Sequence, residues 1–259
     1  MLHVTPVPAF NDNYIWLIHA PNSNRVAIVD PGDAQPVLRT LRENELEPCA
    51  ILITHHHGDH VGGIGDLLSQ YPGLPVYGPS RERIPHLTRA LRGGDSITPD
   101  GLGLRFDVLD VPGHTGGHIA YYGAGALFCG DTLFACGCGR VFDGTIAQLH
   151  ASLGRIAALP ADTRIYCAHE YTLDNIGFAK WVEPENPQLL TREQADFDTR
   201  ERGEPTVPST LELELETNPF LRAGEPTVIA AAERFAGHAL ADSEAVFAAI
   251  RRWKDTEYD

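Results

Sequence analysis

The chain has 259 residues, of which 43% are hydrophobic and 21% charged, values typical of a globular protein with a sizeable core. Its formal net charge of −15 argues against binding to nucleic acids and against a role at a membrane surface. No apolar stretch is long enough to span a bilayer, and the first residues lack the pattern of a secretory signal. The five cysteines have no paired spacing, which is typical of free thiols in a reducing compartment, so we expect a cytoplasmic protein.

Short β-branched runs bounded by turn residues predict strands throughout the first two thirds of the chain. The runs lie at residues 14–18, 25–30, 50–54, 75–78, 104–111, 118–122, 126–130 and 164–168. Apolar residues at helical spacing predict helices between some of these strands, at residues 35–44 and 146–159. Many strands with few helices predict two sheets covered by helices, which is an α/β layered fold.

The pattern changes after Glu170, where prolines separate four segments with helical spacing. These segments lie at residues 171–182, 187–202, 226–237 and 242–254. A further stretch, "STLELELE" at residues 209–216, is ambiguous. Its leucines alternate as in a strand, yet its first four residues match a helix capping box. The last third of the chain is therefore predicted to be mainly α-helical.

The run "THHHGDH" follows directly on a strand that is predicted to be buried. If the chain stays extended there, His55 and His57 point to one side and His56 to the other, so the first two can share one metal ion. Asp59 and His60 come at a turn where a helix is expected to begin, and they can face a second ion beside the first. Imidazole and carboxylate groups bind metals and contribute little to a hydrophobic core. This run is therefore a candidate metal site.

Three further loops place ligand-type residues directly after predicted strands, in the motifs "PGHTGGH", "CGDT" and "CAHE". Loops at strand ends are where a rigid scaffold commonly assembles a site. The four loops together offer five imidazoles and two carboxylates, which suit a pair of borderline divalent cations such as zinc, iron or manganese. The seven candidate ligands are His55, His57, Asp59, His60, His114, Asp131 and His169.

A single structural zinc is the competing interpretation of this cluster. Structural zinc sites favour cysteine and are closed to solvent, whereas no cysteine pair here has C-x-x-C spacing. Cys136 and Cys138 lie close to Asp131, but their C-x-C spacing is weak evidence for a metal. A lone histidine after a strand is usually an ordinary polar residue, so the hypothesis depends on convergence of the four loops. His56 is expected to be a neighbour of the site rather than a ligand.

The order of these motifs resembles that of the metallo-β-lactamase fold superfamily, in which HxHxDH is followed by a glycine-flanked histidine, "GDT" and "AHE". Longer segments resemble the hydroxyacylglutathione hydrolases, the glyoxalase II family. They include "THHHGDHVGG", "LFCGDTLFACGCGRVFDGT", "YCAHEYTLDNIGFA", "ETNPFLR" and the terminal "RRWKD". The resemblance implies a four-layer αββα metallo-β-lactamase sandwich with an α-helical C-terminal domain. It implies a catalytic domain over residues 1–170 and a glutathione-binding domain over residues 171–259.

The resemblance also implies an activity, that of a thiolester hydrolase with two divalent metal ions per chain. Such an enzyme converts S-D-lactoylglutathione and related S-2-hydroxyacylglutathiones to D-lactate and glutathione, the second step of methylglyoxal detoxification. Zn²⁺ is the favoured metal, with iron and manganese as alternatives. The first ion would be held by His55, His57 and His114 and the second by Asp59, His60 and His169, with Asp131 bridging the two. Asp59 and Asp131 would be the catalytic carboxylates.

Glutathione is gripped in this family by basic and aromatic residues, and the resemblance carries five of them over to this chain. They are Arg140, Phe142, Tyr171, Arg251 and Lys254. Arg140 stands where animal members have lysine, which preserves the charge. Phe142 stands where they have tyrosine, which removes a hydroxyl group and leaves a ring that can still pack on the ligand.

Three other functions compete with this one. A persulfide dioxygenase on the same fold keeps a single iron, and the helical extension with its terminal "RRWKD" favours the hydrolase. A nuclease conflicts with the charge of −15, and a purely binding module with the complete ligand set. A covalent route is disfavoured because the chain has no GxSxG motif and no cysteine with an evident histidine partner. We expect a small-molecule glutathione thioester as partner, with no nucleic acid or membrane, and a monomeric protein.

Overall fold

The computed structural model describes residues 2–258 and divides the chain into two compact units. The first unit contains the chain up to Val111 together with Thr115–Gly130, and the second contains Pro112–His114 and the chain from Asp131 onward. This division follows chain contacts and differs from the domain boundary expected after residue 170. The boundary after residue 170 therefore stays a prediction.

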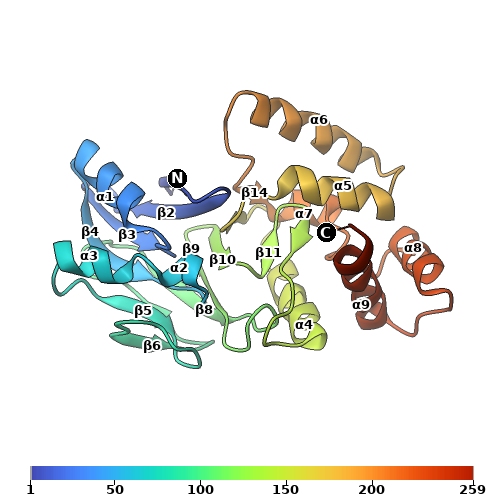
Figure 1. Cartoon of the computed structure of the whole chain (residues 1–259), viewed down its shortest axis with the longest axis horizontal. Coiled ribbons are helices and arrows are strands. Elements are labelled where there is room, and N and C mark those ends of the chain that lie inside the picture. Colours follow the sequence, from blue (N-terminus) through green and yellow to red (C-terminus); the bar gives the residue numbers. More distant parts are fainter. Residues whose placement is uncertain (1, 259) are drawn as a thin grey trace. The chain divides into compact units, whose positions relative to one another are not determined.

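A mixed six-stranded sheet forms the first layer of the first unit (Figure 1). Its strands lie in the order β1 (Val4–Ala9), β2 (Asn13–His19), β3 (Arg25–Val29), β4 (Glu47–Leu52), β5 (Val76–Pro79) and β6 (Arg89–Leu91). The first three strands pair antiparallel and the rest pair parallel. Parallel neighbours need a crossover, and helix α1 (Ala34–Glu43) makes the one between β3 and β4. Four predicted strands are thereby confirmed as β2, β3, β4 and β5.

Helices α1 and α3 (Ile64–Gln70) cover this sheet on one face, as Figure 1 shows. Val37 and Leu41 of α1 and Leu67 of α3 are almost fully buried in the same apolar cluster as Ile28 and Ile51 of the sheet. The spacing of the α1 residues is that of one helix face, which is the pattern that predicted this helix. This packing fixes the end of β4, from which the histidine run emerges.

The other strands of the first unit form antiparallel pairs in the order β7, β8, β9 and β10. Their bounds are β7 (Ser96–Ile97), β8 (Phe106–Asp110), β9 (Ile119–Gly123) and β10 (Ala126–Gly130). The Tyr121 hydroxyl donates a hydrogen bond to the Ile53 carbonyl at 2.8 Å, and the Ile119 amide donates to the Thr54 carbonyl at 3.0 Å. These strands therefore meet the first sheet where β4 ends, next to the histidine run.

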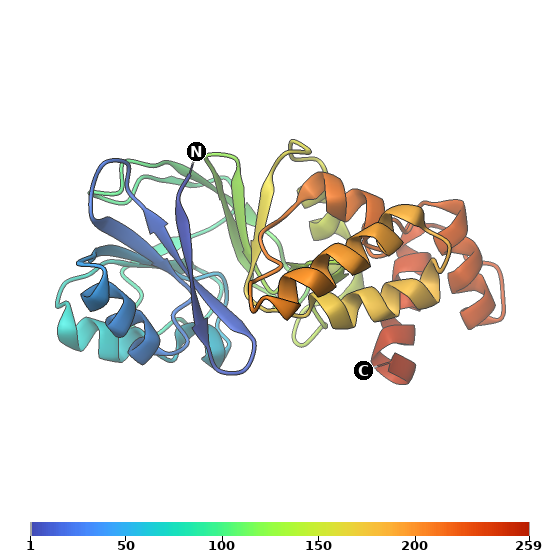
Figure 2. The same ribbon diagram turned by 90° about the horizontal axis from the view of Figure 1, so that it is seen from above.

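The second unit is mainly helical, as predicted. Helices α5 (Thr172–Val182) and α6 (Pro187–Glu201) lie side by side (Figures 1 and 2) and are joined by an ion pair from Lys180 to Glu193 at 2.7 Å. The other elements are α4 (Ile146–Ala157), α7 (Leu211–Thr217), α8 (Pro226–Ala236), α9 (Ser243–Trp253), the π-helical turn η1 (Lys254–Tyr258), and the short strands β11 (Leu133–Phe134), β12 (Gly137–Cys138), β13 (Arg164–Cys167) and β14 (Ser209–Thr210). All five predicted helices of this unit are confirmed.

The ambiguous "STLELELE" stretch is both strand and helix. Ser209 pairs with Ile165 of β13, and α7 begins two residues later. Thr210, one residue beyond the expected cap, accepts the amide of Leu213 through its hydroxyl. The buried residues of α7 are Leu211, Glu214 and Thr217, whose spacing is that of one helix face, so the alternating leucines do not define its inner side.

The terminal helix α9 packs on the body of the second unit. Val246 and Ile250 are 2% and 0% exposed, and the Trp253 ring stacks on Phe235 with centroids 5.2 Å apart. Within residues 2–258, no helix is long and apolar enough to cross a membrane.

Candidate metal centre

The histidine run leaves β4 in an extended conformation and then enters α2 (Gly58–Val61), a single helical turn. Nε2 of His55 and Nδ1 of His57 lie 3.1 Å apart. His56 turns elsewhere, and its Nδ1 lies 3.0 Å from Oε2 of Glu82. The expected alternation is confirmed, so the three neighbouring histidines have unequal environments.

Asp59 and His60 lie in that first helical turn, as the sequence predicted for a turn that begins a helix. Nε2 of His60 lies 3.4 Å from Oδ2 of Asp59, and the same carboxylate oxygen accepts a hydrogen bond from the Asn13 amide at 3.0 Å. The turn approaches the β3–α1 connection closely, since a Cβ atom on Gly32 would lie 1.8 Å from the Asp59 carbonyl oxygen. Glycine is therefore required at position 32 to bring α2 into place.

The three ligand candidates of the second unit meet at one carboxylate oxygen. Oδ2 of Asp131 lies 3.5 Å from Nε2 of His114 and 3.4 Å from Nε2 of His169. All three side chains are buried, with residue exposures between 4% and 7%. An anionic oxygen between two imidazole nitrogens is the arrangement expected of a carboxylate that bridges two cations.

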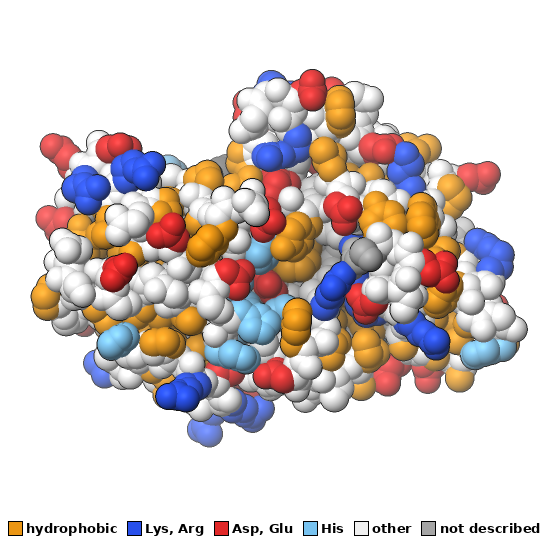
Figure 3. Space-filling model, in the orientation of Figure 1, with side chains coloured by type: hydrophobic (Ala, Val, Ile, Leu, Met, Phe, Trp, Pro, Cys, Tyr) orange, Lys and Arg blue, Asp and Glu red, His pale blue; other side chains and the backbone are white. Residues whose placement is uncertain are grey.

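The spacing of these donor atoms fits divalent metal ions. Two donors bound to one tetrahedral zinc at 2.0–2.2 Å lie about 3.3–3.6 Å apart. The four donor pairs within the units are 3.1, 3.4, 3.5 and 3.4 Å apart. The side chains belong to groups of histidine and aspartate that could each hold a metal ion. On the face drawn in Figure 3, histidine side chains gather with acidic side chains close by.

Buried oxygen atoms lie close to Nδ1 of three of the imidazoles. The Thr54 hydroxyl donates to Asp30 at 2.7 Å and lies 3.1 Å from Nδ1 of His55, and Asp30 also lies 3.1 Å from Nδ1 of His60. Nδ1 of His114 lies 2.8 Å from the backbone carbonyl oxygen of Arg140. Acceptors at Nδ1 of His55 and His114 place the proton there and make Nε2 their ligand atom. Sequence reasoning missed Asp30 and Thr54, although both stand at strand ends beside the motif.

The aromatic and exposed basic candidates for glutathione binding lie beside the ligand histidines of the second unit. The Tyr171 ring stacks on His169 with centroids 4.7 Å apart, and the Phe142 ring meets His114 edge-on at 5.2 Å. Phe142 is 65% exposed and Tyr171 is 36% exposed, which is unusual for large aromatic side chains. Arg140, also expected there, has a side chain that is 54% exposed.

Arg251 and Lys254, the other two basic candidates for glutathione binding, are both buried. The Arg251 side chain is only 1% exposed and donates to Asp255 at 2.7 Å and to the Cys138 carbonyl at 3.1 Å. Lys254 is 7% exposed, with Nζ 3.5 Å from Oδ2 of Asp174. Truncating either residue should therefore also lower the melting temperature, because each side chain is buried and takes part in an ion pair.

The cysteines near the site are buried thiols rather than nucleophiles. All five cysteines are free and buried. Desolvation raises the pKa of Cys136 to about 12 and that of Cys138 to about 11. Because the thiolate is the reactive form, neither residue is a nucleophile at neutral pH, which agrees with the expected absence of a covalent route.

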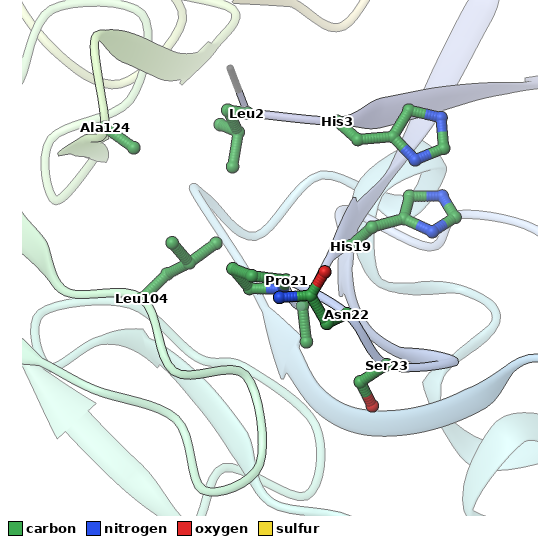
Figure 4. Close-up of a pocket in the computed structure, with 9 residues that line it drawn as sticks. Leu2, His3, His19, Pro21, Asn22, Ser23, Leu104 and Ala124 are labelled. Atoms are coloured by element: carbon green, nitrogen blue, oxygen red, sulfur yellow. The ribbon is translucent and has the colours of Figure 1, made fainter.

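A cavity of about 680 Å³ lies apart from the ligand loops in the first unit, and Figure 4 shows the residues that line it. His3 and His19 stack on its wall with ring centroids 3.9 Å apart, and Nε2 of His19 lies 2.8 Å from the Thr5 hydroxyl. Burial, and then repulsion from His3, lower the pKa of His19 below its usual 6.5. None of these residues belongs to the predicted site.

His19 should make the protein less stable in mild acid. The unfolded chain takes up a proton at this histidine near pH 6.5, whereas the folded protein does so only at lower pH. The stability contributed by neutral His19 is therefore complete above that pH and is lost as the pH falls toward the folded pKa. Melting temperatures of His19→Gln should fall less between about pH 7.5 and 5.5 than those of the parent protein. His86→Gln, at an exposed histidine, is the control, and an equal fall for His19→Gln and the parent would contradict the assignment.

Comparison with known proteins gives consistent matches over nearly the whole chain. A model of the metallo-beta-lactamase superfamily matches residues 9–169, and a model of the hydroxyacylglutathione hydrolase C-terminus matches residues 170–257. The hydroxyacylglutathione hydrolase of Alkalilimnicola ehrlichii is 56% identical, covering 98% of this chain and 99% of the relative. That of Nitrosomonas europaea is 53% identical, covering 98% and 96%. The chain belongs to the hydroxyacylglutathione hydrolase family.

Solved structures agree with the metallo-β-lactamase fold. ETHE1 from Myxococcus xanthus has a TM-score of 0.67 at 22% identity and covers 100% of this chain and 93% of its own. TTHA1623 in a di-iron-bound form has a TM-score of 0.60 at 28% identity, with 84% and 100% covered. The predicted αββα metallo-β-lactamase fold with an α-helical C-terminal region is thereby confirmed.

The two family models divide the candidate residues of this family member between them. The superfamily model contains all seven ligand candidates together with Arg140 and Phe142. The C-terminal model contains Tyr171, Arg251 and Lys254. Fold and donor set together support binding of divalent metal ions by this family member.

Proposed function

We propose that this hydrolase cleaves the thioester of S-D-lactoylglutathione and related S-2-hydroxyacylglutathiones, giving D-lactate and glutathione in the second step of methylglyoxal detoxification. The relatives named hydroxyacylglutathione hydrolase match it over 98% of its length. The structural observation that carries the proposal is the Asp131 oxygen between the imidazoles of His114 and His169. A bridging carboxylate of this kind supports a two-metal hydrolytic site.

Two divalent ions per chain are part of this proposal, with Zn²⁺ as the favoured metal and iron or manganese as alternatives. Of the two ions, the first is assigned to His55, His57 and His114 and the second to Asp59, His60 and His169, with Asp131 bridging. The donor spacings of His55 with His57 and of Asp59 with His60 support this assignment. A related protein in a di-iron-bound form supports a pair of ions.

The protein's own groups prepare the reaction around these ions. When bound, a pair of divalent ions activates a water molecule near neutral pH and polarises a carbonyl oxygen. Asp59 and Asp131 supply the fixed negative charge that holds the pair, and Asn13 keeps the Asp59 carboxylate oriented. Phe142 and Tyr171 cover the neighbouring histidines and limit access of bulk water. The thiol leaving group has a pKa of roughly 8.5, so it departs without a strong general acid.

Glutathione binding is assigned to the helical domain, residues 171–259, together with the loop after β12. The contacts proposed are Arg140, Phe142, Tyr171, Arg251 and Lys254. Arg140 is the exposed cation of this set, and an acidic protein needs such a group to attract an anionic tripeptide. Burial of Arg251 and Lys254 suits a role at the inner end of the subsite, where a carboxylate would displace Asp255 or Asp174 as their partner.

The surroundings of the protein complete the proposal. We place the protein in the cytoplasm, because five buried free thiols suit a reducing compartment. We also propose that it is a monomer. A net charge of −15 disfavours nucleic acid and acidic membranes as partners.

The deciding experiment measures hydrolysis of S-D-lactoylglutathione by protein of known metal content. We expect close to two divalent ions per chain, loss of activity on chelation, and recovery when zinc is restored. Fully loaded protein that leaves this thioester intact would contradict the substrate assignment. Full activity with one ion per chain would contradict the two-metal assignment.

Arg140→Ala should weaken the use of S-D-lactoylglutathione by about tenfold. A hydrogen bond to a charged group contributes about 1.5–3 kcal/mol, and exposure of Arg140 puts the effect at the lower end. The loss should appear as a raised KM because this contact is remote from the thioester. Arg234→Ala, at an exposed arginine of α8, is the matched control. A fall in kcat at unchanged KM would place Arg140 elsewhere in the reaction.

A further inference from the structure

Glu82 is a buried carboxylate with no place in the ligand set. It lies in the connection between β5 and β6, and its side chain is only 3% exposed. Both of its oxygens are engaged. Oε2 lies 3.0 Å from Nδ1 of His56, while Oε1 accepts the Gly117 amide at 3.1 Å and the hydroxyl of Thr115.

These partners come from the two loops that carry the first proposed metal site. His56 stands between His55 and His57, and Thr115 follows His114 directly. We propose that Glu82 is a positioning residue that holds both loops in register for the first metal ion, an inference that rests on the proposed function. Glu82 touches no proposed ligand atom, so it acts through the backbone on either side of each ligand.

The close packing around Glu82 supports a specific fit. A Cβ atom at Gly117 would lie 2.5 Å from Cγ of Glu82, so only glycine lets the second loop approach this carboxylate. A buried carboxylate that accepts hydrogen bonds from two loops resists movement of either one. Metal ligands must be held within about half an ångström of the binding geometry. A clamp on both loops therefore acts directly on affinity for the ion that they share.

The clamp predicts an unequal effect on the two ions. The histidines beside its contacts are assigned to the first ion, whereas Asp59 and His60 are held by Asn13 and Asp30 instead. Loss of a partner that orients metal ligands typically costs about 10–100-fold in metal affinity. Glu82→Ala should therefore bind the first ion about 10–100-fold more weakly and bind the second ion with unchanged affinity. Glu82→Gln, which keeps the shape and one acceptor oxygen, should recover part of the loss.

The test is a zinc titration of metal-free protein against a chelating dye, with no thioester present. The parent protein should bind two ions. The control Glu43→Gln, at an exposed glutamate of α1, should bind each ion with the same affinity as the parent protein. If the Ala variant fails to fold, Thr115→Val removes a single contact and should show a smaller loss at the same ion. Parent protein that binds fewer than two ions would overturn the proposed two-metal function. Parent protein that binds two, with Glu82→Ala or Thr115→Val unchanged at both, would overturn the clamp alone.

Discussion

Asp131→Asn should lose at least one metal ion and about a thousandfold in rate. The substitution keeps the shape of the side chain but removes the negative charge between His114 and His169. Metal ions contribute several kcal/mol to charge stabilisation in the transition state, and each 1.36 kcal/mol is a tenfold change in rate. Elemental analysis and hydrolysis of S-D-lactoylglutathione measure the two effects separately.

The control for this variant is Asp162→Asn, at an exposed aspartate of the second unit. It should keep the metal content and the rate of the parent protein. The Asp131 variant should retain nearly the parent melting temperature when both proteins are metal-free, because the shape of the side chain is preserved. Two bound ions and a nearly normal rate in Asp131→Asn would show that this carboxylate does not bridge the site.

Glu214→Gln should cost about 3–5 kcal/mol of folding free energy, which corresponds to a fall of roughly 10 °C in melting temperature. Glu214 is fully buried and its two oxygens accept four hydrogen bonds. The donors are Arg192 at 2.8 Å, Ser209 at 2.6 Å, the Cys136 amide at 2.8 Å and Asn218 at 3.0 Å. The variant leaves the buried Arg192 guanidinium without a full counter-charge, and attraction to Glu214 is what keeps its pKa above the usual value against desolvation.

Glu212→Gln, on the exposed face of the same helix, is the matched control and should change the melting temperature little. Chemical denaturation monitored by circular dichroism gives the difference in free energy of unfolding. Because Glu214 also holds the backbone amide of Cys136, the variant should loosen the segment between β11 and β12. Equal stabilities for the two variants would mean that this buried pair contributes little.

Local patterns were sufficient for most elements and for the ligand candidates. Apolar periodicity predicted strands such as β2 and β4 and all five long helices of the second unit, because burial on one face leaves a direct record in the residue order. The alternation of His55, His56 and His57 was predictable for the same reason, since it follows from the geometry of an extended chain. Short strands such as β7 and β12, with two residues each, carry no such record.

Contacts between residues distant in sequence were not predictable. Asp30 supports His60 from 30 positions away, and Glu82 reaches His56 from 26 positions away and Gly117 from 35. Arg251 is buried because its guanidinium donates to the Cys138 carbonyl, 113 positions away in the sequence. A helical spacing argument gives the face of the helix on which Arg251 lies and does not show what later covers that face.

The sequence by itself determined the donor types, their order along the chain and the family, because metal-binding chemistry requires particular side chains at strand ends. It also determined which of three adjacent histidines turns away, since backbone geometry is local. Only the tertiary structure decided which buried groups orient the ligands and which proposed substrate cations are exposed. The reason is physical: hydrogen-bond partners and burial depend on where the chain returns, and that is set by packing of the whole unit rather than by neighbouring residues.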